Sequence, residues 1–325
     1  MQGLGFLIWQ LASVPGADEL IRLAKKYNIR WYSIKLANGI LPYNQTGNND
    51  KELKALIQAL QDAGIEVGGW HYSYCTQVGL EGDRAMERIE KLNLSHWLVD
   101  IEGEWSQPYG MPAAAKLYMS KLKVGGLQVG LCSYRYPNYW LNVPFPAFLN
   151  HEAMDVNAPQ VYWEGAHNPA AQLDRSLSEY SKITGKPFIP IGATYGHTQK
   201  DKSWWEPTIA DLQQFVAWCK DKRVPAYGFY SLDWLLTRKH YDWLEAITGV
   251  AYEPPPPPPP PVEPPPAELP EYMTVTAGKL NIRHSPAVLP DNIFAVLPYG
   301  TRVKVEKQDG DWVKLSAWVS KNYLK

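Results

Sequence analysis

The chain has 325 residues, of which 45% are hydrophobic and 20% charged, and its net charge is −1. That length suits one large domain plus a small one, and the apolar fraction is ample for a core. The near-zero charge, without a basic run, argues against a nucleic-acid partner. No apolar stretch is long enough to span a membrane.

The cysteines and the first residues bear on the compartment. Cys75, Cys132 and Cys219 are odd in number and widely spaced, which is typical of free thiols in a reducing compartment and not of a metal site. The first residues lack the basic region of a signal peptide. We therefore expect synthesis in the cytoplasm without a signal peptide, and no motif calls for a metal or a cofactor.

From residue 5 to residue 249, short β-rich runs alternate with helical patterns. The expected strands are Phe6–Leu11, Ile29–Leu36, Glu66–Tyr74, Trp97–Ile101, Gln128–Tyr134, Asp155–Trp163, Phe188–Ala193 and Tyr227–Leu232. The expected helices are Ala17–Tyr27, Asp50–Ala63, Gly82–Leu92, Ala113–Leu122, Ala170–Ile183, Thr208–Asp221 and Arg238–Thr248. Asn49-Asp50 and Thr208 are candidate helix caps.

Eight strands, each followed by a helix or a long loop, predict an α/β fold in which a parallel sheet closes into a (β/α)8 barrel. An open doubly wound sheet is the alternative. The fifth unit is weak, because Pro137, Pro144 and Pro146 interrupt its helix.

The composition changes abruptly after the barrel region. Residues 253–270 are mostly proline, which excludes a helix or a sheet ladder and favours an extended polyproline II spacer; a ligand for a proline-recognition domain is the alternative. Short β-rich runs and turns follow. We therefore predict a barrel domain over 1–250, a proline-rich linker over 251–271 and a small all-β domain over 272–325.

The small domain carries four ordered motifs, which are Leu280-Asn-Ile-Arg283, Leu297-Pro-Tyr-Gly-Thr301, Gly310-Asp-Trp-Val-Lys314 and Ala317-Trp-Val-Ser-Lys-Asn-Tyr-Leu324. Together they resemble the successive motifs of bacterial SH3-like domains. The resemblance implies a small β-barrel that attaches an enzyme to the bacterial cell wall. Trp312 and Trp318 are expected in its core more than in a binding groove.

The stretch from His96 to Trp105 carries the chemistry. Side chains alternate along a strand, so Asp100, Glu102 and Glu104 share one face, and the apolar side chains between them can lie against helices. Mutual repulsion and burial raise the pKa of at least one carboxyl, which can then donate a proton near neutral pH. A solvated strand end with scattered acids is the alternative.

Active sites of such barrels lie at the carboxyl ends of the strands. A carboxyl pair over an aromatic groove is what glycosidic cleavage needs. We predict Glu102 as the general acid, supported by Asp100, with Asp233 facing it from the eighth strand or else capping a helix near Thr237. The predicted substrate-binding residues are Lys35, Trp70, His71, Tyr72, Glu104, Tyr134, Tyr162, Glu164, Tyr195 and Trp234. Lys35 is expected to pair with Asp100 or another acid, and a satisfied histidine at the rim is the alternative to substrate contact for His71.

Four strand ends match a family in order: Ile34-Lys35 with Gly39, Val67-Gly68 with His71-Tyr72, Asp100-Ile-Glu102, and Val129-Gly130. They resemble glycoside hydrolase family 25, the lysozyme-like muramidases. The resemblance implies hydrolysis between N-acetylmuramic acid and N-acetylglucosamine, with Glu102 as the acid. One departure is the first strand, which has no acid before Trp9-Gln10, where the family has an aspartate; Glu104 or Glu164 is a candidate replacement.

The expected function is thus a peptidoglycan hydrolase that acts on bacterial cell walls, either as a phage lysin after release or within a phage-tail-like particle whose baseplate would be its partner. Two alternatives stay open. One is a barrel that has lost activity and only binds glycan. The other is a glycosidase of another amino-sugar polymer such as chitin, because the acidic run resembles the D-x-D-x-E strand motif of chitinases.

Overall fold

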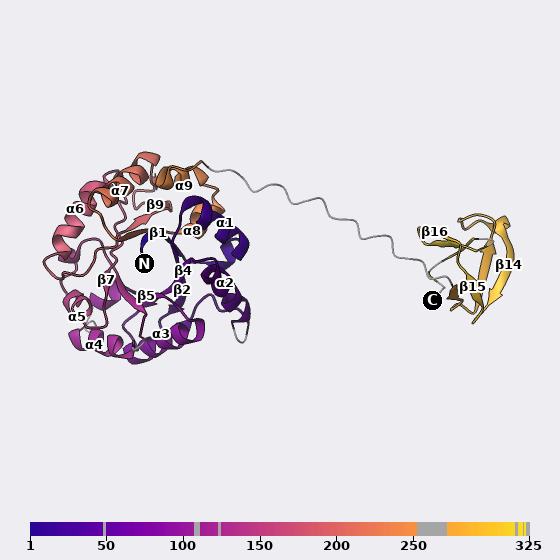
Figure 1. Ribbon diagram of the computed structural model, residues 1–325, viewed down its shortest axis with the longest axis horizontal. Helices are drawn as coiled ribbons and strands as arrows, with labels where there is room; N and C mark the ends of the chain where they lie inside the picture. Colours follow the sequence, from indigo (N-terminus) through magenta and orange to yellow (C-terminus); the bar gives the residue numbers. More distant parts are fainter. Residues whose placement is uncertain are drawn as a thin grey trace. The chain divides into compact units, whose positions relative to one another are not determined.

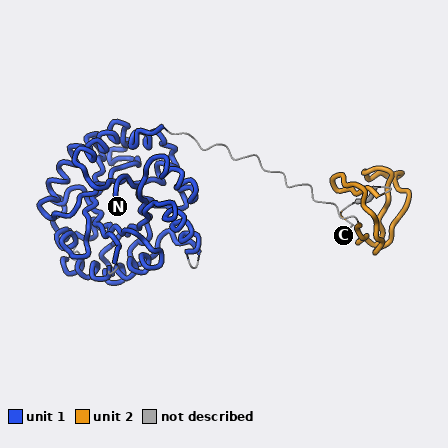
Figure 2. The backbone as a smooth tube through the Cα atoms, viewed as in Figure 1, with its two compact units in different colours: residues 1–254 blue, residues 255–325 orange. Residues whose placement is uncertain are grey.

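The computed structural model describes residues 1–47, 50–106, 111–122, 125–251, 272–315, 318–320 and 322. The chain forms two compact units, residues 1–254 and residues 255–325 (Figure 2). Each has a hydrophobic core of its own. The proline-rich segment and Asn49 lie outside the described residues.

Parallel strands form the wall of the larger unit (Figure 1). They are β1 (Gly3–Ile8), β2 (Trp31–Asn38), β4 (Glu66–Ser73), β5 (His96–Ile101), β6 (Gln128–Cys132), β7 (Val156–Asn157), β8 (Ile191–Ala193) and β11 (Ala226–Tyr230). They pair in the order β7-β6-β5-β4-β2-β1-β11-β8. Parallel bridges from Asn157 to Phe188 and from Gln160 to Ile191 join the two ends. The sheet is therefore closed, which confirms the predicted barrel and excludes the open sheet.

Helices surround the strands as an outer ring (Figure 1). They are α1 (Ala17–Tyr27), α2 (Lys51–Asp62), α3 (Val78–Leu92), α4 (Pro112–Lys121), α5 (Phe145–Leu149), α6 (Pro169–Tyr180), α7 (Ile209–Asp221), α8 (Leu232–Thr237) and α9 (Tyr241–Thr248). The prolines of the fifth unit leave α5 only five residues long. The last expected helix corresponds to α9, which starts at Tyr241, three residues after the predicted start, and α8 precedes it as a helix that was not predicted.

Caps explain two helix starts. Thr208 caps α7 as predicted, with a reciprocal capping box to Asp211. Asp50 precedes α2 but its side chain does not cap it; it binds Arg88 and Lys91 of α3 instead. No helix of the described residues is long and apolar enough to cross a bilayer.

Short elements complete the larger unit. The strand β3 (Leu41–Pro42) pairs antiparallel with β2, and β9 (His197–Thr198) pairs with β10 (Trp204–Trp205). Single 3-10 turns follow β1 at Leu11–Ser13, β5 at Gly103–Ser106 and β6 at Pro137–Tyr139.

The barrel has two layers of packed apolar side chains, one between the strands and the helices and one in the interior that the strands enclose. Trp31 of β2 fills the interior and is fully buried. A Cβ added to Gly5 of β1 would lie 1.9 Å from the Trp31 ring. The first strand therefore has no room for an acid at Gly5, because the indole occupies that space.

The smaller unit is an antiparallel β structure. Its strands are β12 (Tyr272–Thr274), β13 (Lys279–Arg283), β14 (Ile293–Pro298), β15 (Arg302–Lys304), β16 (Lys307–Asp309), β17 (Trp312–Lys314) and β18 (Trp318–Ser320), with a 3-10 turn at Pro290–Asn292. Met273, Val275, Leu280 and Val313 lie in its small core. Trp312 is half-buried, and the side chain of Trp318 lies outside the described residues. The SH3-like resemblance stays a prediction.

Candidate active site

Asp100 in β5 and Glu102 directly after it lie at the carboxyl end of the barrel, as predicted, but the predicted third member of that face, Glu104, lies in the 3-10 turn Gly103–Ser106 and is exposed. Trp97, Val99 and Ile101 pack into the layer between strands and helices. Asp100 points the other way and is 5% exposed. Glu102, directly after the strand, is half-buried. Strand alternation thus delivers both carboxyls to the barrel mouth.

A single amide holds the two carboxyls. Nε2 of Gln160 donates to Asp100 Oδ1 at 2.8 Å and to Glu102 Oε1 at 3.3 Å. Gln160 comes from the chain after β7, where it bridges to β8. The carboxyl pair is therefore held by a side chain that comes from two strands further along the barrel wall.

Burial and repulsion act on both acids. Burial raises the pKa of Asp100 well above its usual value, the Glu102 charge adds to this, and Lys35 opposes it. Burial also raises the pKa of Glu102, against the Gln160 hydrogen bond, while Glu104 and Glu164 raise it further. One proton is therefore retained on the pair at a pH where ordinary carboxyls have lost theirs.

Glu102 borders two cavities. The larger, of about 370 Å³, is lined by Glu102, Tyr134, Arg135, Tyr136, Tyr139, Trp140, Gln160, Tyr162, Glu164 and Tyr195. The smaller, of about 220 Å³, is lined by Leu7, Trp9, Lys35, Trp70, Tyr72, Asp100, Glu102, Cys132, Gln160, Tyr162 and Tyr230. Because both share Glu102, Gln160 and Tyr162, they form one groove with Glu102 between its halves. We call this the mouth groove.

Aromatic rings line the mouth groove. Tyr134 stacks on Trp140, with ring centroids 4.1 Å apart and planes 9° apart. Tyr162, Tyr195 and Tyr230 contact one another, with ring centroids 5.4 to 6.1 Å apart. Flat aromatic surfaces with polar edges suit the apolar faces of sugar rings.

The two candidate replacement acids are both exposed and both accept a tyrosine hydroxyl. Glu104 accepts that of Tyr72 at 3.0 Å, and Glu164 accepts that of Tyr195. Glu164 lines the larger cavity. Glu104 lines neither cavity, and replacement of the first-strand acid by either residue stays a prediction.

Lys35 behaves differently from the prediction. It is 8% exposed, and its Nζ lies 4.8 Å from the ring centroids of Tyr43 and Trp70. Among the described residues it has no carboxylate within 4.0 Å. Burial lowers its pKa, while the charges of Asp100 and Glu102 raise it. The ammonium is thus held by rings and acts on the acids through space.

His71 does not reach the groove. It lies between Trp70 and Tyr72 on β4, so alternation turns it outward. It is fully buried, with Nδ1 2.7 Å from the Tyr118 hydroxyl and Nε2 2.9 Å from the Gly39 carbonyl oxygen. Burial lowers the pKa of His71 to about 4. The predicted substrate contact is therefore not made: His71 is satisfied, as in the alternative, but it is buried against Tyr118 and Trp97 and does not lie at the rim.

Asp233 does not face Glu102. Its carboxylate accepts the backbone N–H of Trp9 at 2.9 Å and that of Gln10 at 3.3 Å. The helix-cap alternative is also wrong, because α8 starts at Leu232 and Ser231 caps it. Asp233 instead anchors the chain that leaves β1, which carries Trp9 to the groove.

Trp234 is likewise outside the groove. It stacks on His240 and Trp243, with ring centroids 5.4 and 5.6 Å away. Of the other predicted contacts, Trp70, Tyr72, Tyr134, Tyr162, Glu164 and Tyr195 all line one of the two cavities.

Several groove residues escaped the sequence reasoning. Tyr230 ends β11, Gln160 follows β7, and both line the groove, so alternation along the expected strands was a usable signal for both. Tyr136, Tyr139 and Trp140 lie on the proline-interrupted loop after β6, which carries no periodicity. Trp9 lies in the groove because of Asp233, a contact between residues far apart in sequence.

Comparison with known proteins supports the fold. No protein-family model matches the chain, and no curated protein sequence matches it. Its structure is similar to a chitinase from Chromobacterium violaceum ATCC 12472, with TM-score 0.57, 9% identity, and coverage of 76% of this chain and 98% of that one. It is also similar to a class V chitinase from Pseudomonas fluorescens Pf-5, with TM-score 0.56, 9% identity, and coverage of 76% of this chain and 98% of that one.

A spore cortex-lytic enzyme from Bacillus megaterium QM B1551 gives a TM-score of 0.50 at 9% identity, covering 73% of each chain. At such identities the likeness establishes a shared barrel fold, and function has to be argued from the site. The muramidase resemblance stays a prediction.

Proposed function

We propose that the larger unit is a glycoside hydrolase of an amino-sugar polymer, with Glu102 as the proton donor. The observation that carries this is the place of Glu102: it borders both cavities of an aromatic groove, and burial raises its pKa. A polysaccharide lying along the groove presents one glycosidic oxygen there. A carboxyl with a raised pKa is the group that can protonate that oxygen near neutral pH.

Asp100 supports this step from below. Repulsion between the carboxyls is mutual, so ionisation of either one helps to keep a proton on the other, and Glu102 is the member of the pair that borders both cavities. Gln160 fixes the orientation of both groups. Asp100 also borders the smaller cavity, where it can accept a hydrogen bond from a substrate N–H.

The attacking group has to approach the sugar away from Glu102. Asp233 is held by two backbone N–H groups, and Trp31 fills the space above Gly5. A 2-acetamido group on the substrate supplies a nucleophile instead. Its carbonyl oxygen bonds to C1 as the C1–O bond breaks and Glu102 protonates the departing oxygen. Water then opens the cyclic intermediate and returns its proton to Glu102.

For the polymer itself we propose bacterial peptidoglycan, cleaved between N-acetylmuramic acid and N-acetylglucosamine so that muramic acid forms the new reducing end. The SH3-like resemblance of residues 272–325 supports a wall substrate, and a cortex-lytic enzyme shares the fold. Chitin is the second candidate, because chitinases share the fold and the run Asp100-x-Glu102-x-Glu104 resembles their strand motif. Delivery within a phage-derived particle, or by release as a lysin, stays a prediction.

Digestion of purified peptidoglycan and of chitin, followed by mass spectrometry of the new reducing ends, tests the proposal. We expect muramic acid at the new ends from peptidoglycan. Glucosamine at those ends would move the cut to the neighbouring bond, and product from chitin alone would select the second candidate. No product from either polymer, with binding retained, would leave a glycan-binding barrel without activity.

A further inference from the structure

Arg135 contributes a positive charge to the larger cavity. It follows Tyr134 directly on the loop after β6 and lines the same cavity as Glu102 and Glu164. Its Nη1 donates to the Tyr162 carbonyl oxygen, and its Cζ lies 5.2 Å from the Tyr136 ring centroid. The guanidinium is thus positioned by the groove wall.

A second arginine on the same ring shows what is unusual here. Cζ of Arg175 lies 3.9 Å from the Tyr136 centroid, and its Nε donates to Glu179 at 2.8 Å. Arg175 is therefore neutralised. Arg135 has no carboxylate within 4.0 Å among the described residues, and Glu164, which lines the same cavity, accepts the Tyr195 hydroxyl.

A guanidinium has five N–H donors in a planar fork that matches a carboxylate. One donor of Arg135 is used on Tyr162, and the cation stays without a counter-charge beside the groove. An uncharged polymer such as chitin offers hydroxyls and amides but no negative charge. A strand of muramic acid carries carboxylates, on its lactyl group or on the peptide joined to it.

We propose that Arg135 is a specificity-determining residue that binds a carboxylate of the glycan and so selects a muramic-acid strand over an uncharged one. This rests on the proposed function and names the substrate feature read by the same groove. Because Arg135 and Glu102 border one cavity, the carboxylate-bearing sugar lies next to the bond that Glu102 protonates.

Binding to the full chain carrying Glu102→Gln tests this without cleavage, with tryptophan fluorescence as the readout. Four ligands separate the chemistry: peptide-bearing strands, peptide-free strands with free lactyl carboxylates, the same strands with those carboxylates converted to methylamides, and a chitin hexamer. Adding Arg135→Gln should weaken the carboxylate strands about tenfold to a hundredfold, as expected for a charge-assisted hydrogen bond. The methylamide strands and the chitin hexamer should change less than about threefold.

The matched control is Arg175→Gln, which removes a guanidinium from the same tyrosine but should leave the discrimination intact. Arg135→Lys keeps the charge without the fork and should restore part of the affinity, which guards against misfolding of the first variant. A loss confined to peptide-bearing strands assigns the carboxylate to the peptide, and a loss that includes peptide-free strands assigns it to the lactyl group.

Equal losses for all four ligands, no loss for any, or no binding of any strand would overturn the role of Arg135. The proposed catalysis fails separately: wild-type protein that binds strands but releases no product refutes the enzyme while leaving the selectivity of Arg135 measurable.

Discussion

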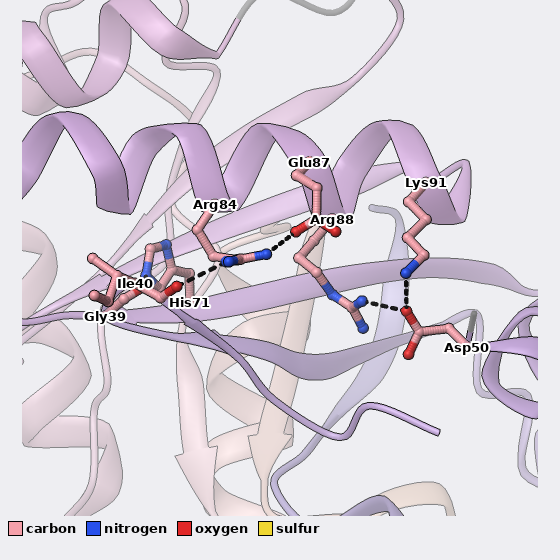
Figure 3. A network of polar contacts seen from close by, with 8 residues as sticks. All are labelled: Gly39, Ile40, Asp50, His71, Arg84, Glu87, Arg88 and Lys91. Atoms are coloured by element: carbon pink, nitrogen blue, oxygen red, sulfur yellow. Dashed lines mark hydrogen bonds and ion pairs between the residues drawn. The ribbon is translucent and has the colours of Figure 1, made fainter. Parts of the chain in front are cut away.

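Asp50 and the pair Asp100–Glu102 differ in how their negative charge is balanced. Asp50 is fully buried and lies 2.6 Å from Arg88 and 2.7 Å from Lys91, both on α3 (Figure 3). Burial would raise the pKa of Asp50, but the hydrogen bonds from Lys91 and Arg88 outweigh it and the pKa is lowered. Asp100 and Glu102 have no such partners, and their pKa values are raised.

The difference teaches how to separate structural from functional acids here. On the outer side of the barrel, α3 supplies cations to the segment before α2, and Arg84 of the same helix donates to the Ile40 carbonyl oxygen (Figure 3). At the mouth, the neighbours of the acids are an amide and aromatic rings. A paired acid stabilises the fold as an anion, whereas an unpaired one favours holding a proton.

The largest expected effect is on the catalytic rate and follows substitution of Glu102, which has no cationic partner in the part of the chain that the structure describes. Glu102→Gln should lower kcat on the cleaved polymer by about 10²–10⁴-fold, the range for loss of a general acid. Glu104→Gln is the control two residues away, since Glu104 is exposed and bound to Tyr72. If Glu104→Gln abolishes activity and Glu102→Gln does not, the assignment of the donor is reversed.

Substitution of Asp50, which is paired with Arg88 and Lys91, should change the stability of the fold and not the catalytic rate. Asp50→Asn leaves Arg88 buried without a counter-charge, and we expect a loss of about 3–5 kcal/mol in the free energy of unfolding. Because the pKa of Asp50 is lowered in the fold, its contribution is present above the unfolded pKa and disappears as the pH falls through the folded one. Denaturant titrations at several pH values measure both.

The exposed Asp62 supplies the control for that experiment. Asp62→Asn should change the unfolding free energy by less than about 0.5 kcal/mol. Equal, small effects of the two variants would show that the Asp50 cluster is not structural.

Asp100→Asn should change how both the stability and the catalytic rate depend on pH. The raised pKa of Asp100 means that its stability contribution is largest at low pH and is lost as the pH rises through the folded value. The variant should therefore gain stability relative to wild type as the pH rises. Without the repelling charge, the alkaline limb of the pH–rate profile should move down by about one unit. A limb that stays in place would separate Asp100 from the proton on Glu102.

The smallest effect is expected at Asp233. Asp233→Asn keeps one acceptor for the Trp9 and Gln10 N–H groups, so Trp9 should loosen without any loss of chemistry. We expect KM to rise about threefold to tenfold with kcat nearly unchanged. Trp9→Ala should give a similar KM, and the double variant Asp233→Asn/Trp9→Ala should raise KM little beyond either single variant. A fall in kcat comparable to that of Glu102→Gln would restore Asp233 to the mechanism.

The fold was predictable because each strand and helix has its own periodicity, and closure of the barrel follows from their number. The acids of β5 were predictable from alternation, and the same rule, applied to β4, excludes His71 between Trp70 and Tyr72. Asp233 and Trp9 were not, because their contact joins residues 224 positions apart. The aromatic residues Tyr136, Tyr139 and Trp140 of the loop after β6 were missed because the prolines there interrupt the hydrophobic periodicity on which the prediction depends.

The central claim is that Glu102 gives a proton to the departing oxygen. It is tested most directly by comparing wild type and Glu102→Gln on the glycan strand and on an aryl glycoside of the same sugar, whose phenolate leaves without protonation. We predict a loss of about 10²–10⁴-fold on the strand and less than about tenfold on the aryl glycoside. Equal losses on both substrates, or full activity on the strand, would contradict the account.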